Sequence, residues 1–397
     1  MQSHRLERPA PRSRHSAFAV AVLFFANGAT FSNWLPRLPE IRDQLGVGNA
    51  GLGATLLGGG LGGVVGSLLV AKAIARLGSR RLLLVAAGTL SIAMPLISLV
   101  HVAPVLLVLL TVLGMFDVFN DVAMNAQGVT VQQQIGRSIM NRLHAMWSLG
   151  FTGGAVLGSL ASAARVDIRL HLGAVGAVLL ITILVVNRWL VPIDPPHEPA
   201  EAATEEGAPK RSLATSPVVI AMAFAAMAAV ALEVLPNDWA ALLMRDVFDA
   251  GRFSGLGTVA CAGAMLVGRL GGDHMLQRVG EHRLLIGALQ LVAVGALITI
   301  VAPVSAVAFV GLIIWGLGLS VVFPQLYATA ARLPGTSAGA GLGAMLFGQR
   351  FGGMLTAVST GALGQWQDLR FAFAVVAIVA FTVLSLTLRR ASAAAHR

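Results

Sequence analysis

The chain has 397 residues, of which 56% are hydrophobic and 12% are charged. Soluble domains carry about 25% charged residues, so the composition argues against a water-soluble enzyme. The formal charge of +10 is spread over short clusters between long apolar runs, which argues against a basic face for nucleic acid. The single cysteine, Cys261, excludes an internal disulfide and a thiolate metal site.

The apolar runs predict an all-α membrane protein. Each crossing of the hydrocarbon core needs about 20 mostly apolar residues in an α-helix. Twelve segments of the chain meet this requirement. With approximate edges they are 17–36, 50–70, 82–100, 104–127, 141–163, 170–190, 216–236, 252–271, 283–301, 305–329, 337–361 and 370–389.

The distribution of Lys and Arg predicts the orientation. These residues concentrate in the N-terminal tail and in segments 72–81, 188–211 and 269–283, which fall on one side if the chain crosses the membrane twelve times. Positively charged loops stay cytoplasmic. We therefore expect a multi-pass protein of the plasma (inner) membrane with both termini in the cytoplasm.

The sequence divides into two halves that repeat. Residues 191–215 are rich in proline and charge, as in a flexible cytoplasmic linker. An offset of 202 residues places glycines and arginines of 1–190 on counterparts in 216–397. The matched pairs are Gly66 and Gly268, Arg76 and Arg278, Gly78 and Gly280, Arg81 and Arg283, and Gly114 and Gly316. This repeat predicts two pseudo-symmetric six-helix bundles.

Segments 66–81 and 268–283 resemble the loop signature of the major facilitator superfamily. The resemblance extends over both halves and implies the major facilitator fold and secondary transport. It also implies that residues of these loops latch an inner gate, although Ala71 stands where the first loop would carry its acid. The residues concerned are Lys72, Arg76, Gly78, Arg81, Asp273, Arg278, Gly280 and Arg283. Alternatively, the basic residues only fix the topology.

A narrower resemblance lies in residues 117–128. The Asp121-x-x-x-Asn125 segment is similar to the acidic-x-x-x-Asn-Pro segment of the fucose–proton symporter branch. Residues 141–150 are similar to the entry of the fifth helix in that branch. The resemblance implies that Asp121 is a proton-coupling carboxylate and that Asn125 is its neighbouring asparagine.

The chain departs from this branch at two places. Ala126 replaces the proline of the segment. The first predicted helix offers Asn27 and Asn33 where the branch has an aspartate. Sugar specificity is therefore not carried over.

Physical reasoning also favours proton coupling by Asp121 and Asp117. A carboxylate inside the bilayer costs several kcal/mol unless it is protonated, paired or hydrated. Four residues apart, the two carboxylates share one helix face with Asn125, and their mutual repulsion favours protonation of one of them. The alternative is that one of them forms a structural ion pair.

Another intramembrane charge is Arg350. An unpaired guanidinium is costly there, so it should bind a carboxylate or an anionic or hydroxyl-rich solute. The candidate partners are Asp117, Asp121 and Glu233. Asp238, which follows the span 216–236, is expected at the membrane interface.

Polar and aromatic residues of the predicted helices complete a candidate substrate site. Amides bind hydroxyl groups as donor and acceptor, and an indole or phenol can stack on a sugar ring. The candidates are Asn27, Asn33, Trp34, Asn120, Asn125, Gln127, Glu233, Trp315, Gln325, Tyr327, Gln349 and Arg350. For Trp34 the alternative is a position in the aromatic belt at the interface.

The function predicted from these features is secondary active transport by a monomer, without cofactor or metal. The sequence has no Gly-x4-Gly-Lys-Ser/Thr loop for ATP. We expect proton-coupled symport of a small polar solute such as a sugar or polyol. The alternative is proton-antiport efflux of amphiphilic compounds, because Gly150, Gly154 and Gly158 resemble a degenerate motif of drug–proton antiporters. An enzyme is not expected, since His144 is the only histidine near a polar helix end.

Overall fold

The structure, a computed structural model, describes residues 11–192, 216–331 and 338–395, without the side chains of 11–14, 273, 338–339 and 389–395. In these ranges the chain forms helices and no strand, which confirms the all-α prediction. The predicted linker 191–215 lies outside the described residues, apart from its first two positions.

The first half of the described chain contains six α-helices and three short 3-10 helices. They are α1 (Pro11–Ser32), η1 (Leu35–Arg37), α2 (Leu38–Leu45), α3 (Asn49–Leu96), η2 (Ile97–Leu99), α4 (Ala103–Ile135), α5 (Met140–Ala163), α6 (Ile168–Val186) and η3 (Asn187–Trp189). The second half has a similar series of elements. They are α7 (Pro217–Asp238), α8 (Ala240–Asp246), η5 (Gly251–Phe253), α9 (Leu256–Val279), α10 (Glu281–Val301), α11 (Ser305–Ala330), α12 (Ala338–Trp366) and α13 (Leu369–Ala395).

Nine segments of the described residues are long and apolar enough to span a membrane. One of them, Asn49–Leu99, contains both predicted spans 50–70 and 82–100. Helices α5 and α12 are 24 and 29 residues long but are rich in glycine and polar residues, and they are not among the nine. A multi-span membrane protein is therefore confirmed, whereas the count of twelve stays a prediction.

Helix α3 contains the predicted spans 50–70 and 82–100 as two helical parts that meet at a kink at Gly78. It is 48 residues long, about twice what one crossing needs, and only Gly78 inside it leaves the helical conformation, with φ 69° and ψ 162°. Gly280, between α9 and α10, has φ 79° and ψ 161°. This region of φ/ψ space is open essentially to glycine alone. The paired glycines of the sequence repeat thus make the same turn, which lets helix continue on both sides of each.

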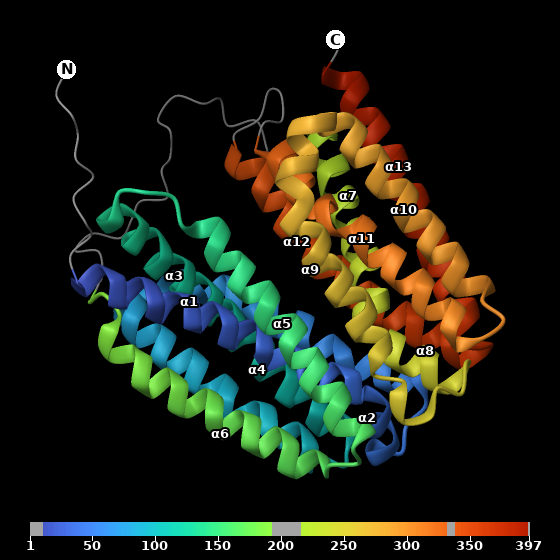
Figure 1. Cartoon of the computed structure of the whole chain (residues 1–397), viewed down its shortest axis with the longest axis horizontal. Coiled ribbons are helices and arrows are strands. Elements are labelled where there is room, and N and C mark those ends of the chain that lie inside the picture. The colour runs from blue at the N-terminus through green and yellow to red at the C-terminus, as the bar shows by residue number, and fades with distance from the viewer. Residues whose placement is uncertain (1–10, 193–215, 332–337, 396–397) are drawn as a thin grey trace.

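The helices form two groups that meet at one end of the molecule. Figure 1 shows α1 to α6 on one side and α7 to α13 on the other, with the groups converging near α2 and α8, away from both termini. Helix α3 packs against α12, and α5 packs against α9. Gly53 of α3 faces the backbone of Ala357 and Gly361 in α12. Because glycine has no side chain, the two groups of helices approach each other closely at these positions.

The outer surface of the molecule is strongly apolar. Large side chains such as Leu68, Leu170, Leu270 and Val267 are more than 60% exposed. An apolar surface of this extent is unusual for a soluble monomer but natural for helices in contact with lipid.

Candidate functional site

A cavity of about 370 Å³ lies between the two groups of helices. One wall comes from α1, η1, α3, α4 and α5, and the other comes from α7, α9 and α12. The volume is within the range of small-molecule sites. A solute bound there would therefore contact both halves of the chain.

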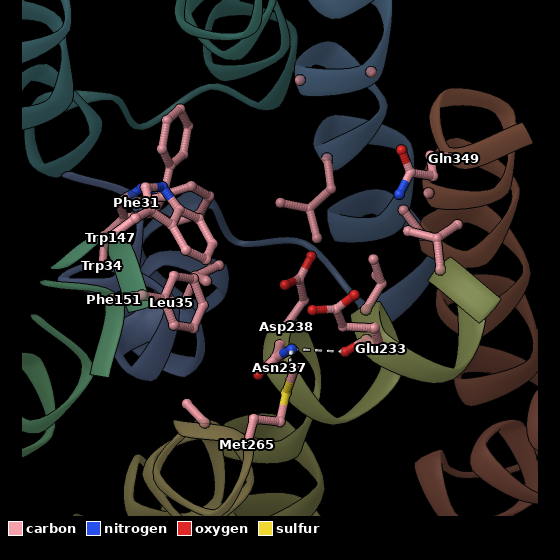
Figure 2. A pocket seen from close by; sticks show the side chains of 18 of the residues that line it. Phe31, Trp34, Leu35, Trp147, Phe151, Glu233, Asn237, Asp238, Met265 and Gln349 are labelled. Carbon is pink, nitrogen blue, oxygen red and sulfur yellow. Dashed lines mark hydrogen bonds between the residues drawn. The ribbon is translucent and has the colours of Figure 1, made fainter. Parts of the chain in front are cut away.

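The first wall of the cavity is aromatic. Phe31, Trp34, Trp147 and Phe151 line it, and Figure 2 shows their side chains gathered on one side. The rings of Trp147 and Phe151 stack, with centroids 5.4 Å apart. The indole Nε1 of Trp34 is buried and has no hydrogen-bond partner among the described residues. Burial of this donor without a partner is energetically costly.

The second wall carries acidic residues from the end of α7. Figure 2 shows the carboxyl groups of Glu233 and Asp238 close together, facing the aromatic wall across the cavity. Asn237, between them in sequence, donates from Nδ2 to the backbone oxygen of Glu233 at 2.9 Å. Its buried Oδ1 accepts no hydrogen bond from the residues that the structure describes. Pro236 lacks an N–H, which leaves the helix one hydrogen bond short at this place.

Arg269 of α9 joins the acidic wall to the first half of the chain. Its Nη2 lies 3.8 Å from Oε1 of Glu233, and its Nη1 donates to Oγ of Ser148 in α5 at 2.9 Å. The sequence interpretation counted Arg269 with the basic segment 269–283. In the structure Arg269 lies inside α9 and lines the cavity, because a polar wall is available there for its guanidinium.

Asp238 also differs from expectation. It was expected at the membrane interface, but it lines the cavity and is only partly exposed. No residue within the described ranges forms a hydrogen bond or ion pair with it. Its carboxyl group is therefore the one cavity acid that the described side chains leave unpaired, since Glu233 has Arg269.

Arg350 and Gln349 extend the cavity along α12. Oε1 of Gln349 accepts a hydrogen bond of 2.9 Å from the hydroxyl of Tyr327 in α11. The guanidinium of Arg350 lies against Gly63 of α3, where a Cβ would displace it. It acts electrostatically on both Asp117 and Asp121, while the third predicted partner, Glu233, pairs with Arg269.

Asp117 of α4 is connected to the cavity through one amide. Nδ2 of Asn27 donates to Oδ1 of Asp117 at 3.3 Å, and Oδ1 of Asn27 accepts from Nε1 of Trp147 at 2.7 Å. Trp147 in turn lines the cavity. We call this chain of contacts, Asp117–Asn27–Trp147, the Asn27 bridge.

Asp121 lies one turn further along α4 and is exposed. Oδ1 of Asp121 accepts a hydrogen bond of 3.0 Å from Nδ2 of Asn125. The charge of Asp121 also acts on His144 in α5 and on Tyr327 in α11. The predicted carboxylate pair thus faces polar groups of both halves.

Eight of the twelve predicted substrate residues do not line the cavity. Three of them are Asn27, Asn125 and Tyr327, whose contacts are given above. Asn33 contacts His171 of α6 at 3.2 Å, and Trp315 packs on Phe373 in the core. Gln127 is fully buried, where its Nε2 donates to Oγ of Ser79 at 2.9 Å and to the backbone oxygen of Val191 at 2.8 Å. The remaining two, both buried, are Asn120 and Gln325.

The predicted inner-gate residues lie at the end of the molecule where the groups diverge. Among the described residues no ion pair involves the five basic positions, which are all exposed. These are Lys72, Arg76, Arg81, Arg278 and Arg283. The side chain of Asp273 lies outside the described residues.

The opposite end is closed by ion pairs between α2 and α8. Arg42 donates to Asp246 at 2.5 and 3.1 Å, and Arg245 donates to Asp43 at 2.7 and 3.0 Å. Burial lowers the pKa of Arg245, but the hydrogen bonds and charges of Asp43 and Asp246 outweigh it, so the pKa lies above its ordinary value. We call Arg42, Asp43, Arg245 and Asp246 the charge quartet.

The comparisons with known proteins agree with this architecture. The profile of the major facilitator superfamily matches residues 20–357. The chain belongs to this superfamily. A major facilitator transporter of Yersinia pestis, itself uncharacterised, is 27% identical over 379 residues, covering 92% of this chain and 93% of that protein. The membrane protein MosC of Rhizobium meliloti is 26% identical over 336 residues, covering 84% and 79%.

Solved structures of the superfamily share the fold at low identity. A bacterial homologue of the human lysosomal transporter Spinster superposes with a TM-score of 0.72 at 13% identity, covering 96% of this chain and 98% of that one. The nucleoside transporter NupG gives 0.70 at 14%, covering 94% and 98%. The D-xylose–proton symporter gives 0.67 at 15%, covering 94% and 96%. This major facilitator chain is therefore a membrane transporter, and its narrower branch stays a proposal.

The sequence interpretation missed several residues that line the cavity. Trp147, Ser148 and Phe151 on α5 gave no signal beyond ordinary helix composition. Arg269 and Asp238 did give a signal in the sequence. A lone arginine near the end of the span 252–271, and a second acid five residues after Glu233, both needed a polar neighbour. No group of three or more potential metal ligands occurs in the described part of the chain.

Proposed function

We propose that this transporter is a proton-coupled carrier of a small polar solute. Asp121 and Asp117 carry the proton, and the solute binds in the cavity between the aromatic and acidic walls. The Asn27 bridge is the observation that carries this proposal, because it links one of the two carboxylates to a side chain that would touch the solute.

Protonation changes the bridge in a defined way. A hydrogen bond to a carboxylate is about twice as strong as one between neutral groups. When Asp117 takes up a proton, the bond from Nδ2 of Asn27 weakens, and the amide that fixes Trp147 is less restrained. Loss of charge on Asp121 also removes the attraction to Arg350 across the two halves. Both effects lower the cost of rearranging the cavity.

The proposed cycle is alternating access by two six-helix halves, residues 1–190 and 216–397, joined by the linker 191–215. We place twelve spans in the plasma membrane, with both termini cytoplasmic and a monomer as the working unit. In this orientation the charge quartet is on the outer face, so the structure corresponds to a carrier closed to the outside. Exposure of Asp121 supports access of water from the inner side.

The resemblance to the fucose–proton symporter branch supports the choice of α4 as the coupling helix. Symport of a sugar or polyol is the form of transport that this resemblance favours. A second candidate is efflux of amphiphilic compounds by proton antiport. The apolar rings of Phe31, Trp147 and Phe151 at the cavity favour it, since they offer a large apolar surface.

The test is proton movement in de-energised cells that express the protein. External pH is followed in weak buffer while sugars, polyols, amino sugars and hydrophobic cations are added in turn. Symport predicts alkalinisation of the medium when one compound is added outside, because a proton enters the cell with it. Antiport predicts acidification, because entry of the added compound is exchanged for a proton that leaves the cell. Asp121→Asn and Asp117→Asn should each reduce the signal, whereas Asp249→Asn, on an exposed loop, should retain it. An unchanged signal in both α4 variants overturns the proposal.

A further inference from the structure

We infer that the solute of this cavity is an organic cation, a protonated amine. This inference rests on the proposed function, because it assigns the substrate class of the same cavity. It depends on the charges and aromatic rings of the described side chains.

The charge balance of the cavity leaves one acid for a cation. Two acids and two arginines line it. Arg269 is held by Glu233 and Ser148, and Arg350 lies against Gly63 within electrostatic range of Asp117 and Asp121. Asp238 has no partner in the described chain. An ammonium group supplied by the solute would neutralise it where a buried unpaired carboxylate is costly.

The opposite wall suits a cation as well. The side chains of Phe31, Trp147 and Phe151 line it, and aromatic rings attract cations through their quadrupole. Neutral sugars would also stack on such rings, but they would leave Asp238 uncompensated. The combination of a free acid and an aromatic wall therefore favours an amine.

The experiment measures binding to the purified full-length protein in detergent, by its thermal unfolding midpoint. The probes are matched sets that differ in charge: D-glucosamine with D-glucose and N-acetyl-D-glucosamine, ethanolamine with ethylene glycol, and tyramine with 4-ethylphenol. At least one amine should raise the midpoint in a dose-dependent way, and its neutral counterparts should not. A panel without any amine response, or an equal response to the neutral counterpart, overturns the inference.

Variants connect the response to the site. Asp238→Asn should weaken the amine affinity at least about tenfold, because it removes a charged partner, and Asp238→Glu should retain the preference for amines. Asp249→Asn is the matched control, since this exposed acid lies outside the cavity. Unchanged affinity in Asp238→Asn overturns the inference.

The outcomes separate this inference from the proposed function. Amine binding by a protein that moves no protons supports the substrate class and overturns proton coupling. Proton movement driven by a neutral solute supports the coupling and overturns the substrate class.

Discussion

Asp43 and Arg245 lie 202 residues apart in the chain, and two hydrogen bonds of 2.7 and 3.0 Å join their side chains. The same offset pairs the glycines and arginines of the sequence repeat, so the two residues occupy equivalent positions of the halves. Their helices, α2 and α8, begin at Leu38 and Ala240, again 202 residues apart. The quartet therefore forms where equivalent parts of the two halves meet.

We predict that removing the acids of the quartet opens this end of the molecule. Exposed ion pairs contribute about 0.2–1 kcal/mol each, so Asp43→Asn with Asp246→Asn should shift the equilibrium by about 1 kcal/mol, roughly fivefold. The measurement is the rate at which a maleimide that does not cross membranes labels the variant Leu35→Cys. Leu35 lies on the cavity wall. All variants carry Cys261→Ser, so that the introduced cysteine is the one thiol that can react. Cys261 itself is buried.

Asp249→Asn again serves as the control for the quartet, because it removes an acid just beyond α8 without touching an ion pair. Equal labelling rates in the double variant and the parent would mean that the quartet does not hold this end closed.

The Asn27 bridge predicts a coupled pair of substitutions. Asn27→Ala leaves the indole N–H of Trp147 without its acceptor, which should destabilise the protein by about 1–3 kcal/mol. Trp147→Phe removes that donor, so Asn27→Ala should cost less in this background, where only the hydrogen bond from Asn27 to Asp117 is left to lose. Unfolding of the four proteins of this cycle gives the coupling energy. Additive effects of the two substitutions would contradict the bridge.

We predict that an alanine at position 280 destabilises the protein through backbone strain and not through a steric clash. A Cβ there meets no atom within 4 Å, but φ is 79° and ψ 161°. Gly280→Ala should therefore destabilise by about 1–3 kcal/mol through strain alone. Gly287→Ala is the matched control, because it also meets no atom within 4 Å but lies inside helix α10, where alanine is favoured by about 1 kcal/mol. Similar unfolding midpoints for both variants would argue against the strained turn.

Close packing of α5 on α1 predicts a steric effect. A Cβ on Gly150 would overlap the backbone oxygen of Phe25, whereas a Cβ on Gly153 would come no closer than 3.9 Å to the ring of the same residue. Gly150→Ala should reduce the yield of folded protein, and Gly153→Ala should be tolerated. Size-exclusion profiles of the two variants in detergent provide the comparison. A folded Gly150→Ala protein of parental stability would contradict the close approach.

The sequence predicted the fold well because its signals are local. Apolar runs placed the helices, and the spacing of Gly78 and Gly280 revealed the repeat before their common φ/ψ values did. The break between the predicted spans 50–70 and 82–100 is a single turn at Gly78, with helix on both sides of it.

The site was harder to predict because it depends on contacts between distant segments. Asn27 and Trp147 are 120 residues apart, and nothing local indicates their hydrogen bond. Gln127 illustrates the opposite case. A glutamine in a predicted span suggested solute binding, but a buried amide can equally be satisfied by backbone, as Val191 does here. Only the tertiary arrangement distinguishes the two.

Gln127 has a mechanical consequence. Its amide joins α4 to Ser79, directly after the turn at Gly78, and to Val191, beyond the end of α6. Asp117 and Asp121 lie on the same helix, two to three turns away. A rotation of α4 about its axis would therefore pull on the α3 turn and on the chain leaving α6 at once. One buried amide thus ties the helix that carries Asp117 and Asp121 to two other segments of the first half.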